Sequence, residues 1–175
     1  MSNNNTKLTE ATIQEKLIRA YRNDCHLMIP NLYIFDWESD VFKQLKSGYT
    51  EEIEIKISIA DFKADKNKVI KHEIVSTGFK YSISDQKKIE TTKRPNRFYY
   101  AVPEFMVNIV EVPEYAGLLC VFEDLRRDPN VIKKAPLLHK DKLDIDYKYL
   151  ARKLADRLCE AQLDRRNLIN RLTKS

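Results

Sequence analysis

Glycine is scarce in this chain, with only three residues among 175. A Walker-type phosphate loop, or the glycine-rich loop of a dinucleotide-binding domain, needs several glycines close together. Both loops are therefore excluded, and with them the commonest nucleotide-binding folds. Any phosphate that this protein binds has to be held in another way.

Cysteines and long apolar runs are also few. The three cysteines are far apart and form no C-x-x-C pair, so neither a disulfide framework nor a zinc knuckle is indicated. The longest apolar run, YAGLLCVF at 115–122, is much shorter than a membrane span, and the N-terminus lacks the apolar segment of a signal peptide. We therefore expect a cytoplasmic protein that makes no contact with membranes.

Positive charge is modest overall, at a net +5, but it is unevenly distributed. Between residues 63 and 97, ten Lys and Arg residues stand against four Asp and Glu residues. Such a segment either forms a solvated face or supplies cations to the phosphates of a nucleic acid. The candidate DNA-binding residues are Lys63, Lys66, Lys68, Lys71, His72, Lys93, Arg94 and Arg97.

Hydrophobic periodicity and turn residues predict one α/β domain with a long helix at its end. The expected helices are 9–23, with Thr12 and Glu15 as a capping box, then 59–71, capped by Ser58, and finally a helix from Asp144 onward. The expected strands are 32–45, 49–58, 97–103 and 116–122, of which the last two are apolar enough to lie in the middle of a sheet. The segment 73–94 is expected to be irregular, with a short helix near 84–90.

The predicted domain organisation follows from these elements. Residues 1–8 are expected to be disordered, 9–142 to form the domain, and 143–175 to form an amphipathic helix. The apolar stripe of that last helix is Tyr147, Leu150, Leu154, Leu158 and Ala161. The helix at 59–71 is expected to bury Phe62, Val69 and Ile70.

The strand at 49–58, YTEEIEIKIS, raises the main functional question. Its alternation places Ile53 and Ile55 on one face, and Glu54 and Lys56 on the other. Since Glu and Lys are common on exposed strands, a solvated polar face is the simplest interpretation. The strand that precedes it suggests a second interpretation, in which this face is a metal site.

A three-residue loop at 46–48, with Gly48 in the left-handed conformation, would join the two strands as a hairpin. This register sets Val41 opposite Ile53 on the apolar face, Asp40 opposite Glu54 on the polar face, and Glu38 opposite Lys56. Two carboxylates so close repel each other unless a cation lies between them. The predicted metal ligands are Asp40, Glu54 and the carbonyl of Ile55, with Lys56 stabilising the charge of a transition state. A register slip of one residue would turn Asp40 to the other face.

The spacing Asp40…Glu54-Ile55-Lys56 resembles the D…(D/E)-x-K core of the PD-(D/E)XK nuclease superfamily. The continuation EIKISIADFKADKNK, with NRFYYAVPE after it, is similar to the corresponding segments of MmcB-related DNA repair proteins. The resemblance implies a restriction-endonuclease-like mixed β-sheet flanked by α-helices. It also implies a site in which Asp40 and Glu54 bind Mg²⁺ or Mn²⁺ and Lys56 is catalytic. Ser39 stands where the superfamily often has proline, and Asp61 and Asp65 match the helix motif downstream.

The expected function is therefore metal-dependent hydrolysis of DNA, in repair or in a phage or mobile-element context. An accessory repair factor that binds DNA without cutting it is the alternative, and a structural domain with a Glu54–Lys56 ion pair is a third interpretation. Glu15 is an additional candidate metal ligand, although it also belongs to the expected capping box. The sequence leaves the oligomeric state open, including a homodimer.

Overall fold

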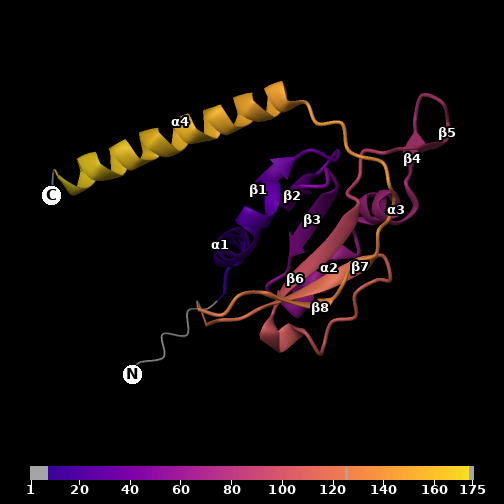
Figure 1. Ribbon diagram of the computed structural model, residues 1–175, viewed down its shortest axis with the longest axis horizontal. Coiled ribbons are helices and arrows are strands. Elements are labelled where there is room, and N and C mark those ends of the chain that lie inside the picture. The colour runs from indigo at the N-terminus through magenta and orange to yellow at the C-terminus, as the bar shows by residue number, and fades with distance from the viewer. Residues whose placement is uncertain (1–7, 125, 174–175) are drawn as a thin grey trace. The chain divides into compact units, whose positions relative to one another are not determined.

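The computed structural model describes residues 8–124 and 126–173, and it contains a mixed sheet of six strands (Figure 1). The strands, in spatial order, are β1 (Cys25–Tyr33), β2 (Glu38–Leu45), β3 (Thr50–Ile55), β6 (Arg97–Pro103), β7 (Ala116–Val121) and β8 (Asn130–Lys133). The pairs β3–β6 and β6–β7 are parallel and the others are antiparallel. The predicted α/β architecture, with a mixed sheet, flanking helices and a long C-terminal helix, is confirmed.

The β2–β3 hairpin has the predicted register. Val41 pairs with Ile53, and the pairing continues to Gln44 and Thr50. The ladder between these two strands ends at Val41 and Ile53, so the predicted pairs Asp40–Glu54 and Glu38–Lys56 are not part of it. Gly48 closes the loop with a φ of 88°, a left-handed conformation that glycine adopts without a steric penalty. Because the loop length fixes the register, β2 and β3 present their polar side chains on the face that the sequence indicated.

Helices cover both faces of the sheet (Figure 1). On one face, α1 (Glu10–Tyr21) packs Ile13 and Leu17 into a cluster with Ile53 and Ile55 of β3. On the other face, α2 (Ile59–Asp65) and α3 (Val69–Thr77) pack against the aromatic side chains of β6 in a second cluster. Strand β3 is therefore covered on both faces, and all six of its residues are buried.

The N-terminal third of the domain differs from the prediction in three ways. Most of the predicted disordered segment lies outside the described residues, but Leu8 is buried in the first core cluster. The strand predicted at 32–45 is two strands, and Pro30, expected in a connection, lies inside β1. Proline is tolerated there because β1 is an edge strand. The capping box of α1 is formed by Thr9 and Thr12 instead of Thr12 and Glu15.

The prediction of a single helix at 59–71 is also wrong. Ser58 caps α2 as expected, but α2 ends at Asp65 and α3 begins at Val69. The break changes the direction of the chain, so Phe62 is buried as predicted while Val69 and Ile70 are 64% and 74% exposed. The helix predicted near 84–90 is instead part of an antiparallel hairpin of β4 (Phe79–Ser82) and β5 (Lys87–Glu90).

The chain divides into two compact units, of which the second begins at Asp144. This second unit contains α4 (Tyr147–Leu172), whose N-terminus is capped by the side chain of Asp146. Leu154 and Leu158 of the predicted apolar stripe are exposed. No helix in the described ranges is long and apolar enough to cross a membrane.

Candidate active site

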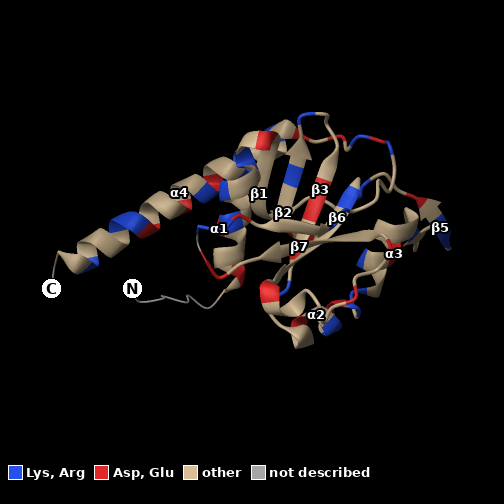
Figure 2. Ribbon diagram, turned by 60° about the horizontal axis from the view of Figure 1, so that its bottom comes forward, with Lys and Arg blue, Asp and Glu red and all other residues tan. Residues whose placement is uncertain are grey.

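The polar face of β3 is buried. Glu52 and Glu54 are 0% and 1% exposed, and Lys56, which directly follows the strand, is 4% exposed. Figure 2 shows the acidic positions of β3 in the middle of the sheet. A solvated face is therefore the wrong interpretation, since α2 and α3 cover these charges and each of them needs a partner.

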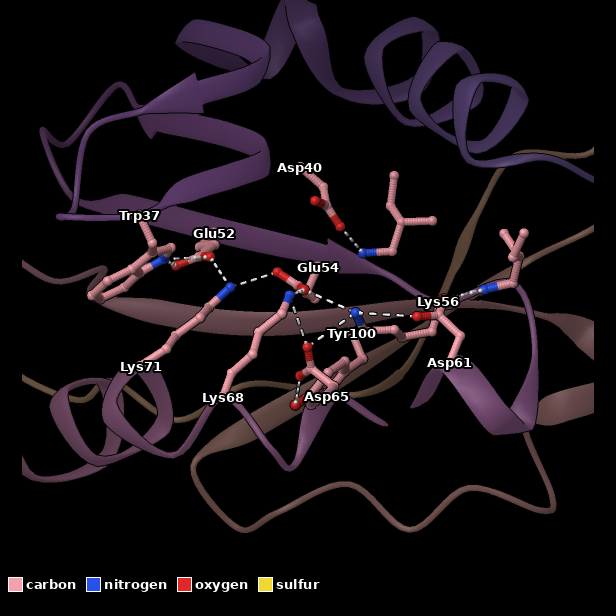
Figure 3. A network of polar contacts seen from close by, with 12 residues as sticks. Trp37, Asp40, Glu52, Glu54, Lys56, Asp61, Asp65, Lys68, Lys71 and Tyr100 are labelled. Carbon is pink, nitrogen blue, oxygen red and sulfur yellow. Dashed lines mark hydrogen bonds and ion pairs between the residues drawn. The ribbon is translucent and has the colours of Figure 1, made fainter. Parts of the chain in front are cut away.

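Three lysine ammonium groups contact the carboxylate of Glu54 (Figure 3). The Nζ atoms of Lys56 and Lys68 lie 2.9 and 2.5 Å from Oε1, and Nζ of Lys71 lies 2.5 Å from Oε2. Lys71 also contacts Glu52 at 2.7 Å. Burial opposes ionisation of Glu54, but Lys71 and Lys56 outweigh it, so the pKa of Glu54 lies below its usual value.

Lys56 is held between acidic side chains. Its Nζ contacts Glu54 at 2.9 Å and Oδ1 of Asp65 at 3.0 Å, and it lies 3.8 Å from Asp61. Burial disfavours the charge of Lys56, but the neighbouring Glu54 and Asp65 more than compensate and raise its pKa. Lys56 therefore stays protonated at neutral pH and can act as a fixed positive charge, but not as a general base.

Asp40 lies on β2 beside the charged face of β3. Its Oδ2 accepts a hydrogen bond from the backbone N–H of Ile55 at 2.7 Å, while Oδ1 has no hydrogen-bond partner among residues 8–124 and 126–173. Burial, followed by the charge of Glu54, raises the pKa of Asp40 to about 7. The two carboxylates thus repel each other, as the hairpin register predicted.

The chemistry of this donor set fits a divalent cation. Mg²⁺ commonly uses one or two carboxylates together with water and phosphate oxygens, and a cation here would relieve the repulsion that raises the pKa of Asp40. Lys68, whose side chain is 50% exposed, would have to leave Glu54 to make room. Within the described ranges, no three His, Cys, Asp or Glu side chains gather as a metal site. The carbonyl of Ile55 remains a predicted ligand.

Glu15 does not join these residues. It is exposed on α1 and pairs with Arg19 at 3.2 Å, one helical turn away. The side of α1 that faces Asp40 carries Gln14, whose Nε2 donates to the Asp40 carbonyl at 3.1 Å, and Glu10, whose charge contributes to the raised pKa of Asp40. Glu10 and Gln14 share a helix face at the i, i+4 spacing, and Glu15 lies outside that face.

The sequence places Asp65 in the motif downstream of Lys56 but gives it no role in the site. Asp65 accepts from the hydroxyl of Tyr100 at 2.8 Å and contacts Nε2 of His72 at 2.9 Å, in addition to Lys56 and Lys68. These partners overcome the effect of burial and lower the pKa of Asp65. Tyr100 lies beside Asp65 because β6 runs parallel to β3 and pairs Tyr100 with Glu54. The sequence signal was Asp65 itself, in the motif that follows Lys56.

Most of the predicted DNA-binding residues have internal partners. Lys68 and Lys71 bind the acids of β3, His72 contacts Asp65 and the hydroxyl of Tyr115, and Arg94 donates to the carbonyl of Val75. Lys93 pairs with Asp36, and Arg97 lies 3.9 Å from Glu51. The side chains of Lys63 and Lys66 are exposed and form no ion pair with another residue that the structure describes. The positive segment therefore serves mainly to neutralise the domain's own carboxylates.

Comparisons with known proteins support the fold only. No protein family model matches the chain, and no curated protein matches it. Among solved structures, the SPO1766 protein of unknown function from Silicibacter pomeroyi is similar, with a TM-score of 0.57 and 18% sequence identity. The similarity covers 90% of this chain and 91% of that one, so it extends over most of the length of both chains.

Proposed function

We propose that this protein is a Mg²⁺- or Mn²⁺-dependent deoxyribonuclease of the PD-(D/E)XK type, with DNA as its partner. The observation that carries the proposal is the position of Asp40 beside the end of β3: its Oδ2 accepts from the N–H of Ile55, and burial together with the charge of Glu54 raises its pKa to about 7. Perturbed carboxylates beside a fixed cation are typical of active sites. The fold is compatible with that of the superfamily.

Each residue of the site has a separate role in this proposal. Asp40 and Glu54 hold the cation, which when bound neutralises a phosphate oxygen and lowers the pKa of a water molecule. Lys56, kept protonated by Glu54 and Asp65, stabilises negative charge that develops on the phosphate. Asp65, fixed by Tyr100 and His72, positions the Lys56 ammonium group.

One observation favours the alternative of an accessory DNA-binding factor without turnover. Lys68 and Lys71 already neutralise Glu54, as a metal ion would. If Lys68 does not leave Glu54 when DNA arrives, the site keeps its fold but binds no metal. The two functions therefore differ in whether the half-exposed Lys68 side chain can be displaced.

A cleavage assay separates them. Single-stranded, duplex and branched DNA are incubated with the protein and Mn²⁺ or Mg²⁺, and the products are resolved on a denaturing gel. Asp40→Asn is the key variant, because asparagine can still accept the hydrogen bond from Ile55 N–H but is a poor metal ligand. We expect it to lower the cleavage rate by about 100-fold or more. Glu15→Gln is the matched control, since Glu15 is an exposed carboxylate with only a surface ion pair.

Cleavage by the wild type and by Glu15→Gln, but not by Asp40→Asn, supports the nuclease. If all three proteins bind DNA and none of them cleaves it, the protein is an accessory DNA-binding factor and the proposal of a nuclease is wrong. Cleavage that Asp40→Asn retains would place the chemistry elsewhere in the molecule.

A further inference from the structure

A hollow of about 690 Å³ lies next to the candidate active site. Its lining comes from the β1–β2 connection and from the start of α3, and it includes Trp37, Glu38, Lys68, Val69 and Ile70. We call it the Trp37 hollow. Lys68 connects the hollow to the candidate active site, because it lines the hollow and its Nζ contacts Glu54. A molecule bound in the hollow would therefore contact the same lysine that binds a proposed metal ligand.

Two apolar side chains of the lining are not part of the core, whereas Trp37 packs against the second core cluster. Val69 and Ile70 are 64% and 74% exposed at the first turn of α3. The indole of Trp37 is half-buried, and its Nε1 donates to both oxygens of Glu52 at 2.9 and 3.1 Å. The ring is thus locked in orientation while it lines the hollow. A fixed aromatic ring beside exposed aliphatic side chains offers a flat apolar molecule a place to stack.

The charges at the rim favour an anionic chain next to this apolar surface. Asp36 lines the hollow and is paired with two lysines, Lys80 and Lys93; together with Lys68 and Glu38 of the lining, this makes three lysines against two carboxylates. These lysines, above all Lys93, lower the pKa of Asp36. Lys68 lies on the same lining with a half-exposed side chain. Glu38 is a second exposed carboxylate of the lining, and it can accept hydrogen bonds from the amino groups of a base.

We propose that the Trp37 hollow binds unpaired nucleobases of single-stranded DNA, with the backbone phosphates on the lysines at its rim. This inference rests on the proposed function and specifies its substrate, since a base inside a duplex cannot reach the Trp37 ring. An aromatic ring beside a positively charged groove is how proteins bind single strands without reading their sequence. DNA with unpaired nucleotides would then present its phosphates to Asp40, Glu54 and Lys56.

Binding in the hollow can be followed by intrinsic fluorescence, because Trp37 is the only tryptophan of the sequence. Fluorescence of the full-length protein is measured while a deoxythymidine oligomer of about 12 nucleotides is added at low salt, in EDTA so that no metal and no cleavage is involved. A duplex of the same length is the comparison ligand. We expect the single strand to quench the fluorescence and to bind at least about tenfold more tightly than the duplex.

Surface variants test the place of binding. Val69→Ser with Ile70→Ser should weaken binding of the single strand by about tenfold, because both side chains are exposed and their removal leaves the core intact. The matched control is Val131→Ser with Ile109→Ser, which removes the same side chains at other exposed positions, 48% and 59% accessible. The control should bind as the wild type does.

The outcomes are distinct from those of the cleavage assay. Absence of quenching by the single strand, equal quenching by the duplex, or equal weakening by the two double variants would each overturn the inference. If the wild type cuts DNA but DNA does not quench Trp37, the proposed nuclease function is supported and the proposed binding of DNA in the hollow is wrong. If the single strand quenches Trp37 as expected and no DNA is cut with Mn²⁺, the proposed binding in the hollow is supported and the proposed nuclease function is wrong.

Discussion

The two faces of β3 are equally buried and chemically opposite. Ile53 and Ile55 are 2% and 3% exposed against α1, while Glu52 and Glu54 are 0% and 1% exposed against α2 and α3. The apolar face needs only packing. The charged face needs a partner for every group, and the basic residues of α3 and of the break before it supply them. A fold that required only burial could use hydrocarbon on both faces, so the retained charges indicate a function.

The difference also explains the charge pattern of the sequence. The excess of Lys and Arg after residue 63 suggests a DNA-binding surface, but Lys71 and Lys68 are directed at Glu52 and Glu54. An acidic strand and a basic helix that follow each other in the chain neutralise each other once the helix packs on the strand. Net surface charge is therefore lower in this region than a count along the sequence predicts.

The largest effect on stability is expected from breaking the charged face. Lys71→Met leaves Glu52 and Glu54 without the cation that they share, at distances of 2.7 and 2.5 Å. We expect the free energy of unfolding, measured by urea denaturation, to fall by about 3–5 kcal/mol. Lys63→Met, at an exposed position of α2, should change it by less than about 0.5 kcal/mol. If the two variants are equally stable, the ion pairs of the charged face contribute nothing to the fold.

The second largest effect on stability is expected from Asp40, whose contribution to the free energy of unfolding depends on pH. The folded protein holds a proton on Asp40 up to about pH 7, whereas the ordinary pKa of an aspartate side chain is 3.8. The unfolded chain therefore binds fewer protons between these values, and the free energy of unfolding decreases as the pH rises through this range and levels off above it. Between pH 5 and 8, the wild type should lose about 2 kcal/mol more than Asp40→Asn does.

The measurement is urea denaturation at several pH values, repeated with Mg²⁺. At pH 8, Mg²⁺ should raise the stability of the wild type more than that of Asp40→Asn, because the cation binds the ionised pair. Parallel pH curves for the two proteins would show that the carboxyl of Asp40 is not perturbed in the folded state. Equal effects of Mg²⁺ would count against Asp40 as a metal ligand.

The smallest effect is expected on the apolar face. Ile53→Val removes one methylene from the cluster under α1 and should lower the free energy of unfolding by about 1 kcal/mol. The loss should be the same at pH 5 and pH 8, because no group that titrates in this range depends on that side chain. A loss that varies with pH would mean that the two faces are coupled through the strand, and the contrast between them would be weaker than the structure suggests.

Much of the local arrangement followed from the sequence. Alternation in YTEEIEIKIS assigned Glu54 and Lys56 to one face, and the short loop with Gly48 fixed the register that brings Asp40 to the same side. Both depend on interactions between residues close in the chain, where the period of a strand and the length of a loop allow few alternatives. The break between α2 and α3 was missed because a helical pattern of apolar residues continues across it.

Burial was decided by the tertiary structure alone. A strand with one charged face looks exposed in sequence, and it becomes buried only when α2 and α3 pack over it. The surroundings of Lys56 were settled in the same way, because Asp65 reaches it from α2, and Tyr100, which donates to Asp65, comes from a strand 45 positions along the chain from Ile55. Parallel pairing of β3 and β6 has no local signature, since the connection between them is long. The sequence determined which charged groups of β2 and β3 lie together, and the tertiary structure determined that they are removed from water. Burial raises the pKa of Asp40, whereas the partners that the fold brings to Glu54, Lys56 and Asp65 shift their pKa values against the effect of burial.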